Sequence, residues 1–298
     1  MRKILLAAFF LSSINAFCQS DGLISHYMFN PLIINPAYAG FDEALTVNAM
    51  VKSQWTGVEG APNTQIFSLH SPVTEKMSVG LILANDQMGP LNQKGFFATY
   101  AYRVPFSDGY VSLGLQAGST FYNMQTENFS LLNPMDPVFS GNNFNQAVPN
   151  FGSGILYARK NFYLGLSMPQ LLRFSEEEFI SHSLQRQNTI LYGSYSFTLN
   201  NDLQVNPTTL LYFRNGLPPE INVGANFLIR KVIWAGVLYR SQQTLSFLSK
   251  LMLNRQLTIG YAYDYHLGEV RSLANGSHEF LFSYTFNYKK RLVSPQYF

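Results

Sequence analysis

The sequence predicts an all-β protein: a closed antiparallel transmembrane β-barrel of about 14 strands with both termini on the periplasmic side. Charged residues make up 12% of the 298 residues, about half of the roughly 25% found in soluble domains. Aromatic residues reach 15%. After the first segment, no apolar run approaches the roughly 18 residues of a spanning helix. An exported chain of this composition has one way into a membrane, the closed barrel.

The chain begins with a predicted secretory signal peptide, residues 1–18. Two basic residues precede the apolar stretch Ile4–Phe10, and cleavage is expected before Gln19. A lipoprotein with lipidated Cys18 is the alternative, which bulky Phe17 disfavours. Cleavage before Gln19 removes the only cysteine, so the mature chain would have no disulfide. The formal net charge of +3 falls to +1 without the two leader basic residues, which gives no nucleic-acid footprint.

Segments in which apolar and polar residues alternate recur along the chain, with turn residues between them. This pattern is typical of strands with one lipid face and one wet face, and single-chain bacterial barrels have an even number of them. The predicted barrel covers residues 45–288. Its expected strands are 45–53, 62–70, 76–85, 95–104, 110–122, 148–159, 161–168, 187–198, 202–213, 219–230, 231–241, 242–253, 256–266 and 277–288.

The last of these segments carries an aromatic residue at every second position. Successive side chains of a strand point to opposite faces of the sheet. We therefore expect one face of this strand to contact lipid and the other to line the lumen. The lipid face is Phe280, Phe282, Tyr284, Phe286 and Tyr288, and the lumen face includes Ser283, Thr285 and Asn287.

The connections alternate between long and short, as in outer-membrane barrels with long outer loops and short periplasmic turns. The expected long connections are 54–61, 86–94, 123–147, 169–186 and 267–276. In 169–186, Glu176–Glu178 are expected to form a solvated face or a short helix start and not a metal site. Residues 19–44 are expected to be an N-terminal periplasmic or plug segment, and 289–298 a periplasmic C-terminal tail. A soluble two-domain β-sandwich is the alternative, but its wet face would carry more Lys and Glu.

The sequence contains no recognisable catalytic or metal motif, and we predict no enzyme activity, no cofactor and no metal. The histidines lack metal-ligand spacing such as HExxH. Ser277, His278 and Glu279 resemble a catalytic triad only by type, because neighbours on a strand point to opposite faces. A barrel lipase assembled from different strands is left open as an alternative.

Several stretches in order resemble the PorP/SprF family of outer-membrane proteins associated with the type IX secretion system. Lys52 and Gln296 stand where the family pattern suggests arginine, which weakens the expectation of a bidentate anion contact at either position. The matching stretches are FNPLIINPAYAG (29–40), SQWTGVEGAPNTQIFSL (53–69), LPPEINVGANF (217–227), GVLYRS (236–241), LTIGYAYDY (257–265), GSHEFLFSYTF (276–286) and RLVSPQYF (291–298).

The resemblance implies a non-enzymatic outer-membrane barrel that supports secretion or cell-surface retention of specific cargo, such as gliding adhesins. Its implied partners are the C-terminal secretion domain of the cargo, other type IX secretion components including periplasmic ones, and outer-membrane lipid, without nucleic acid. The alternative is an outer-membrane transporter for apolar small molecules, with the N-terminal segment as its plug.

Candidate contact residues follow from this reading. Asn30, Pro31, Asn35 and Pro36 are expected to shape the segment that enters the first strand. An alternative role is open for two of the sets given below: the basic residues of the tail 289–298 would also suit the edge of the membrane, and Trp55 would suit the aromatic belt at the membrane interface. The cargo candidates, on outer loops 54–61, 123–147 and 169–186, are Trp55, Phe129, Phe139, Phe144 and Phe174. The candidates for a periplasmic partner are Lys289, Lys290, Arg291, Tyr297 and Phe298.

Overall fold

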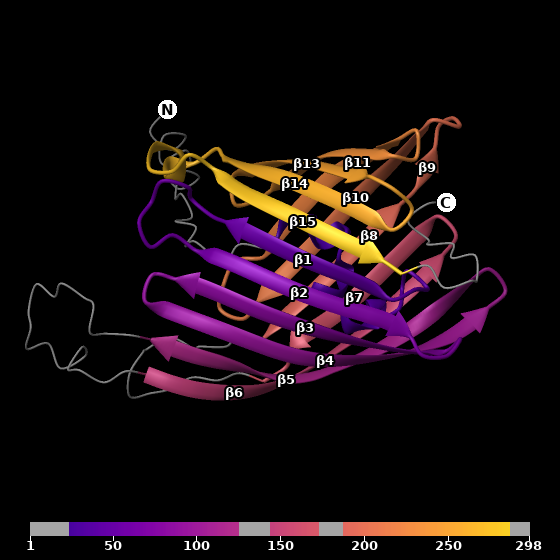
Figure 1. Ribbon diagram of the computed structural model, residues 1–298, viewed down its shortest axis with the longest axis horizontal. Helices are drawn as coiled ribbons and strands as arrows, with labels where there is room; N and C mark the ends of the chain where they lie inside the picture. The colour runs from indigo at the N-terminus through magenta and orange to yellow at the C-terminus, as the bar shows by residue number, and fades with distance from the viewer. Residues whose placement is uncertain (1–23, 125–143, 173–186, 287–298) are drawn as a thin grey trace, which may run out of the picture.

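The computed structural model describes residues 24–124, 144–172 and 187–286, which form a closed antiparallel barrel (Figure 1). Each strand pairs with its neighbours in sequence, and the last strand pairs with the first, from Thr46 opposite Thr285 to Ser53 opposite His278. The strands are β1 (Thr46–Ser53), β2 (Asn63–Pro72), β3 (Met77–Met88), β4 (Leu91–Phe106), β5 (Gly109–Met124), β6 (Phe144–Arg159), β7 (Phe162–Gln170), β8 (Asn188–Tyr195), β9 (Phe197–Thr198), β10 (Leu203–Arg214), β11 (Glu220–Ile229), β12 (Ile233–Arg240), β13 (Thr244–Met252), β14 (Leu257–His266) and β15 (Ser277–Thr285).

The barrel has fourteen strands, because β8 and β9 are two parts of one strand. Both pair with β10, and only Ser196 separates them. The predicted fold class and strand count are therefore confirmed. Each of the fourteen predicted ranges overlaps one strand of the barrel, with boundaries that differ by a few residues in most of them.

One predicted outer loop, 86–94, is wrong. β3 and β4 continue as a paired ladder up to Met88 opposite Leu91, so that Gly89 and Pro90 alone connect them. β5 and β6 also extend beyond their predicted ends, to Met124 and Phe144. The reason is physical. Asn85 and Lys94 lie opposite each other on the outward face and are polar, so the alternation of apolar and polar residues that predicted the strands stops there, although the backbone hydrogen bonds between β3 and β4 continue.

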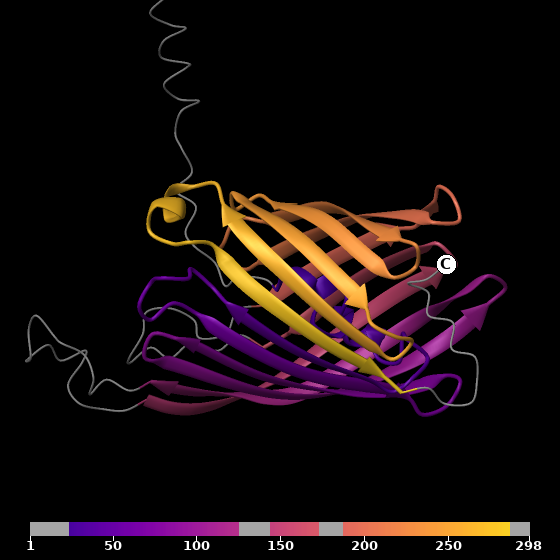
Figure 2. The same cartoon turned by 45° about the horizontal axis from the view of Figure 1, so that its top comes forward.

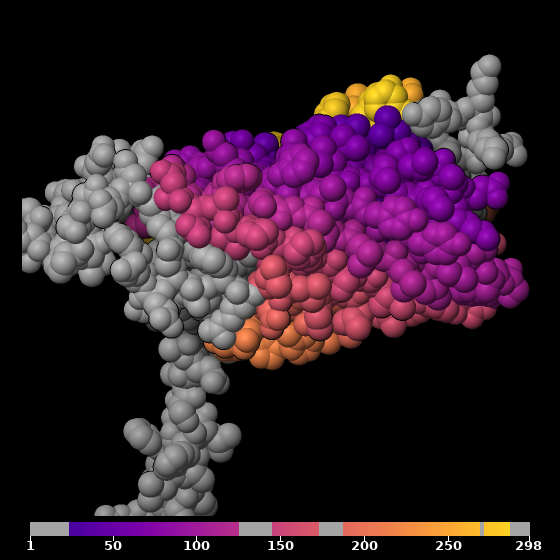
Figure 3. Space-filling model, turned by 90° about the horizontal axis from the view of Figure 1, so that it is seen from below, coloured from indigo at the N-terminus to yellow at the C-terminus, as the bar shows by residue number. Residues whose placement is uncertain are grey.

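The two faces of the strands differ as expected. On β15, Phe280 and Phe282 point outward and are exposed, whereas Ser277, Glu279 and Leu281 point inward and are buried. Figure 3 shows one side of the outer surface, where side chains of the earlier strands pack into a continuous face. The predicted lipid and lumen faces of the last strand are confirmed as far as residue 286; its last two predicted residues lie outside the described part.

Residues 24–41, which we call the lumenal segment, lie inside the barrel (Figure 2). The segment forms three short 3₁₀ helices, η1 (Ser25–Met28), η2 (Pro31–Ile33) and η3 (Pro36–Tyr38). A proline begins both η2 and η3, where its missing N–H costs no hydrogen bond. In the part of the chain that is described, no helix is long and apolar enough to cross a membrane.

The lumenal segment runs from one end of the barrel to the other. Ser25 contacts Glu279, which is two residues from the start of β15. At the opposite end, Leu45 precedes β1 and its carbonyl accepts a hydrogen bond from the N–H of Phe286, just after β15. The first and last described residues therefore lie at opposite ends of the barrel. The periplasmic position of both termini concerns residues outside the described part and stays a prediction.

Candidate functional site

Three inward-facing glycines of neighbouring strands make room for the lumenal segment. We call Gly114 on β5, Gly154 on β6 and Gly165 on β7 the glycine pad. A Cβ built on Gly114 would lie 2.1 Å from the backbone nitrogen of Ala37. A Cβ on Gly154 would lie 2.0 Å from the Oδ1 of Asn35. Glycine in a strand interior often marks such a close backbone approach, and here it lets η3 lie directly on the sheet.

Asn35 fixes the segment to the pad through its side-chain amide. Its Nδ2 donates to the carbonyl oxygens of Ile155 at 3.1 Å and Leu166 at 3.4 Å. Its Oδ1 accepts a hydrogen bond from the N–H of Ala37 at 2.9 Å. Asn35 thus joins η3 to β6 and β7 in the lumen, which is a larger role than shaping the entry to the first strand.

The middle of the lumen is filled by apolar and aromatic side chains. Tyr27, Tyr38 and Phe41 belong to one buried cluster. The hydroxyls of Tyr27 and Tyr38 are buried in this cluster. Neither hydroxyl has a hydrogen-bond partner within the described residues. The strand residues of the same cluster are Leu156, Ala158, Ile190, Tyr192, Leu210, Tyr212, Leu238, Leu248 and Ala262. The centre of the barrel is therefore a packed core and not a water-filled channel.

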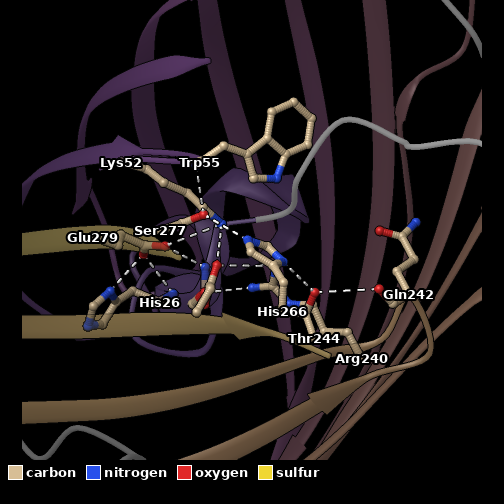
Figure 4. A network of polar contacts seen from close by, with 11 residues as sticks. His26, Lys52, Trp55, Arg240, Gln242, Thr244, His266, Ser277 and Glu279 are labelled. Atoms are coloured by element: carbon tan, nitrogen blue, oxygen red, sulfur yellow. Dashed lines mark hydrogen bonds and ion pairs between the residues drawn. The ribbon is translucent and has the colours of Figure 1, made fainter. Parts of the chain in front are cut away.

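The first residues of the lumenal segment are held by a buried carboxylate near one mouth of the barrel (Figure 4). The backbone N–H groups of Ser25 and His26 donate to the two oxygens of Glu279, at 2.7 and 2.9 Å. The Nδ1 of His26 also lies 2.6 Å from Glu279 Oε1. His26 and Glu279 are both almost fully buried. One strand carboxylate thus binds two successive backbone groups and a ring nitrogen.

A second carboxylate extends this arrangement, which we call the mouth network: Ser25, His26, Lys52, Arg240, Asp264 and Glu279. Ser25 Oγ donates to Asp264 at 2.7 Å and accepts from Arg240 Nη2 at 2.6 Å. Lys52 Nζ lies 2.9 Å from Asp264 and 3.9 Å from Glu279. Two cations thus balance two carboxylates, as buried charges require.

Trp55 lies in the loop above the mouth network, and its backbone is strained. Its φ of 44° is unusual for a bulky residue. Its N–H donates to Ser277 Oγ at 3.2 Å. The N–H of Thr56 donates to the carbonyl of Gly276, and the carbonyl of Thr56 accepts from the N–H of Asn275. Loop 54–62 is therefore fastened to loop 267–276. The indole of Trp55 points away from the network (Figure 4).

The structure describes two of the predicted contact residues. Trp55 lies on the loop as expected, and Phe144 begins β6 opposite Met124 instead of lying in a loop. The other predicted cargo and partner residues lie outside the described part: Phe129, Phe139, Phe174, Lys289, Lys290, Arg291, Tyr297 and Phe298. The mouth network was not predicted from the sequence. Its signal was the charge at lumen-facing positions such as Lys52 and Glu279, in strands that otherwise carry few charges.

The predicted exclusion of a Ser277–His278–Glu279 relay agrees with the geometry, since Ser277 and Glu279 are buried inside and His278 Nδ1 lies beside the outward Tyr261 hydroxyl. A different pair is formed instead: His266 Nε2 lies 3.2 Å from Ser277 Oγ. Ser277 is buried and accepts from Trp55. The other ring nitrogen of His266 contacts the Thr244 hydroxyl and not a carboxylate. Among the described residues, no three His, Cys, Asp or Glu side chains are grouped as metal ligands.

Solved structures of other proteins were compared with this barrel. The barrel is similar to the CymD monoaromatic hydrocarbon channel (TM-score 0.52, 12% identity, 91% of this chain and 95% of that chain). It is also similar to the outer membrane protein Omp33 of Acinetobacter baumannii (TM-score 0.49, 6% identity, 82% and 100%). At such identities the likeness concerns the fold. No curated protein sequence matches the chain.

A family comparison agrees with the motifs found in the sequence. The family described as type IX secretion system membrane protein PorP/SprF matches residues 16–284, which include the lumenal segment and all the strands except Thr285, the last residue of β15. The chain therefore belongs to the PorP/SprF family, and it is a multi-pass β-barrel of the outer membrane in the type IX secretion system.

Proposed function

We propose that this barrel is a non-enzymatic component that supports secretion or surface retention of specific cargo through its outer loops. The observation that carries the proposal is the filled lumen. The lumenal segment packs into one core with the strands and is bound at the mouth by Glu279 and Asp264. Because the interior is occupied, the surfaces at the two ends of the barrel are the parts free to bind partners.

The outer loop surface suits a protein partner. Loop 54–62 is hydrogen-bonded to loop 267–276, and Gly60 also accepts from Gly89 in the β3–β4 turn. These connections therefore form one ordered platform. Val58 and Leu273 are exposed apolar side chains on it, and Trp55 on the same platform is half-buried. Aromatic anchors surrounded by ordered polar groups are typical of binding hot spots.

The proposed partners are those that membership of the PorP/SprF family implies. We propose that the cargo binds the outer platform through its C-terminal secretion domain, with Trp55 among the contacts. The predicted outer loops 123–147 and 169–186, with Phe129, Phe139 and Phe174, extend the proposed surface, and Phe144 adds to it from the start of β6. The tail Lys289, Lys290, Arg291, Tyr297 and Phe298 is proposed to contact a periplasmic component of the secretion system.

The test is deletion of the gene followed by analysis of proteins on intact cells and in the medium. We expect one or a few large surface proteins to leave the surface or to disappear from the medium. Complementation with the Trp55→Ala variant should restore them only in part, since a hot-spot aromatic contributes about 2 kcal/mol or more, roughly thirty-fold in affinity. Val73→Ala changes an exposed apolar residue at the opposite end and should restore them fully. If every large surface protein keeps its place and level in the deletion strain, the proposal fails.

A second candidate function is transport of apolar small molecules, favoured by the fold likeness to a monoaromatic hydrocarbon channel. In that case the lumenal segment would act as a movable plug. Liposomes with the purified barrel would then take up a hydrophobic solute, and deletion of residues 21–40 would change the uptake. If neither the full-length barrel nor the variant without residues 21–40 takes up more solute than protein-free liposomes, this function is excluded.

A further inference from the structure

The entry point of the lumenal segment lies at the end of the barrel with the long connections. Ser25 and His26 bind Glu279 and Asp264. These two strand residues are two positions from the ends of β15 and β14, and the connection that joins those ends is 267–276. Loop 54–62 lies at the same end, since Trp55 donates to Ser277.

The exit point lies at the end with the short connections. The segment ends near His70 and Arg103, because His70 Nδ1 accepts from Gly40 N–H and Arg103 donates to the Gly40 carbonyl. β1 then begins at Thr46, opposite Thr285 at the end of β15. The connections at this end are the brief turns 73–76, 107–108, 160–161, 199–202, 230–232 and 253–256. The lumenal segment thus runs the length of the barrel before β1 turns back.

In bacterial outer-membrane barrels the long connections face the cell exterior and the short turns face the periplasm. We propose that the amino-terminal segment enters the lumen from the cell-surface side. The amino terminus of the mature chain then lies at the cell surface, whereas β15 ends on the periplasmic side. This differs from the sequence-based expectation of two periplasmic termini, which followed from strand parity alone.

Covalent geometry supports the assignment. With cleavage before Gln19, five residues precede Ile24, and they span at most about 18 Å at about 3.6 Å per residue. β1 alone has eight residues, about 26 Å at about 3.3 Å per residue. The lumen between the two ends is filled, and the β1–β15 ladder closes the wall. A mature terminus that starts at the mouth therefore has no path to the other side, and the barrel must close around the segment.

Single cysteines test the proposal, because the only cysteine of the chain, Cys18, belongs to the predicted signal peptide. Three variants are compared: Asp21→Cys, Leu273→Cys as the outer reference, and Glu75→Cys as the periplasmic reference. Leu273 and Glu75 are both exposed, in loop 267–276 and turn 73–76. Cells are treated with a membrane-impermeant polyethylene glycol maleimide before and after permeabilisation of the outer membrane. Heat-modifiable migration of each variant on gels confirms that its barrel is assembled.

We expect Asp21→Cys to react in intact cells to the same extent as Leu273→Cys, and Glu75→Cys to react only after permeabilisation. If Asp21→Cys reacts only after permeabilisation, or in neither state, the proposal is overturned. This result is independent of the proposed function, because labelling needs no cargo. Loss of cargo retention would leave the topology unaffected, and periplasmic labelling of Asp21→Cys would leave the outer platform in place.

Discussion

The lumenal segment is held by two regions that use different physics. At the glycine pad, the absence of side chains lets η3 pack directly against β5–β7. Asn35 donates hydrogen bonds there to the backbone carbonyls of Ile155 and Leu166. At the mouth network, the start of the segment is held by charge, with Lys52 and Arg240 around Asp264. Close packing tolerates little added volume, whereas a buried ion network tolerates no lost partner. The two regions should therefore respond to opposite kinds of substitution.

The largest effect is expected at the mouth. Lys52→Ala removes a cation that lies near both Asp264 and Glu279. Breaking a buried ion pair costs about 3–5 kcal/mol, because the remaining charge is buried without compensation. Urea unfolding of the barrel in lipid vesicles measures the loss. Lys76→Ala, on an exposed turn, should change stability by no more than about 0.5 kcal/mol. Equal values for the two variants would show that the network does not hold the barrel and segment together.

Added volume should break the glycine pad. In Gly114→Ala the new methyl group would overlap backbone atoms of Pro36 and Ala37. Overpacking of this kind costs about 1–3 kcal/mol. Gly193→Ala is the matched control, since its nearest atom is the Leu164 side chain at 3.3 Å. The same unfolding assay should separate the two variants clearly. If Gly114→Ala is as stable as Gly193→Ala, the segment does not rest on the pad.

The pairing of Asn35 with Gly154 can be isolated by a double-mutant cycle. Asn35→Ala leaves the buried N–H of Ala37 without its acceptor, at a cost of about 1–3 kcal/mol. Gly154→Ala alone places a methyl group against the Asn35 amide. In the double variant that amide is absent, so the second substitution should cost less, with an interaction energy of about 0.5–3 kcal/mol. Additive costs would mean that the two residues do not meet.

The smallest effect concerns Ser277. Its hydroxyl accepts from Trp55 and lies beside His266, so Ser277→Ala should cost about 0.5–1.5 kcal/mol, the value of an ordinary hydrogen bond. We expect a serine-directed phosphonate to leave the wild-type chain unlabelled, because the hydroxyl is buried. Covalent labelling that disappears in Ser277→Ala would instead revive the barrel-lipase hypothesis.

Most of the wall of the barrel was predictable. A strand with lipid on one side repeats its pattern every two residues, and this locates β11 or β15 within a few positions. The prediction failed at the β3–β4 turn, where the alternation of apolar and polar residues ends before the hydrogen-bonded pairing of the two strands does. The strand ends there depend on backbone hydrogen bonds, which any residue except proline can donate and accept whatever its side chain.

The contents of the lumen were much less predictable. The motif NPAYAG indicated a family, but nothing local states that Asn35 reaches β6 and β7. The contact pairs residues separated by 120 or more positions along the chain. Inward charges such as Lys52 and Glu279 were visible in the sequence as exceptions to the pattern. The sequence did not show that Glu279 binds the backbone of Ser25 and His26, or that Lys52 lies between Asp264 and Glu279.

The sequence by itself determined the barrel and its lipid face, because these follow from local composition and from a two-residue period. The export signal at residues 1–18 stays a prediction. Only the tertiary structure decided what fills the barrel, from which end the lumenal segment enters, and which charges bind it. Those features depend on side chains brought together from strands far apart in the chain, and the closure of β15 on β1 is what brings them together.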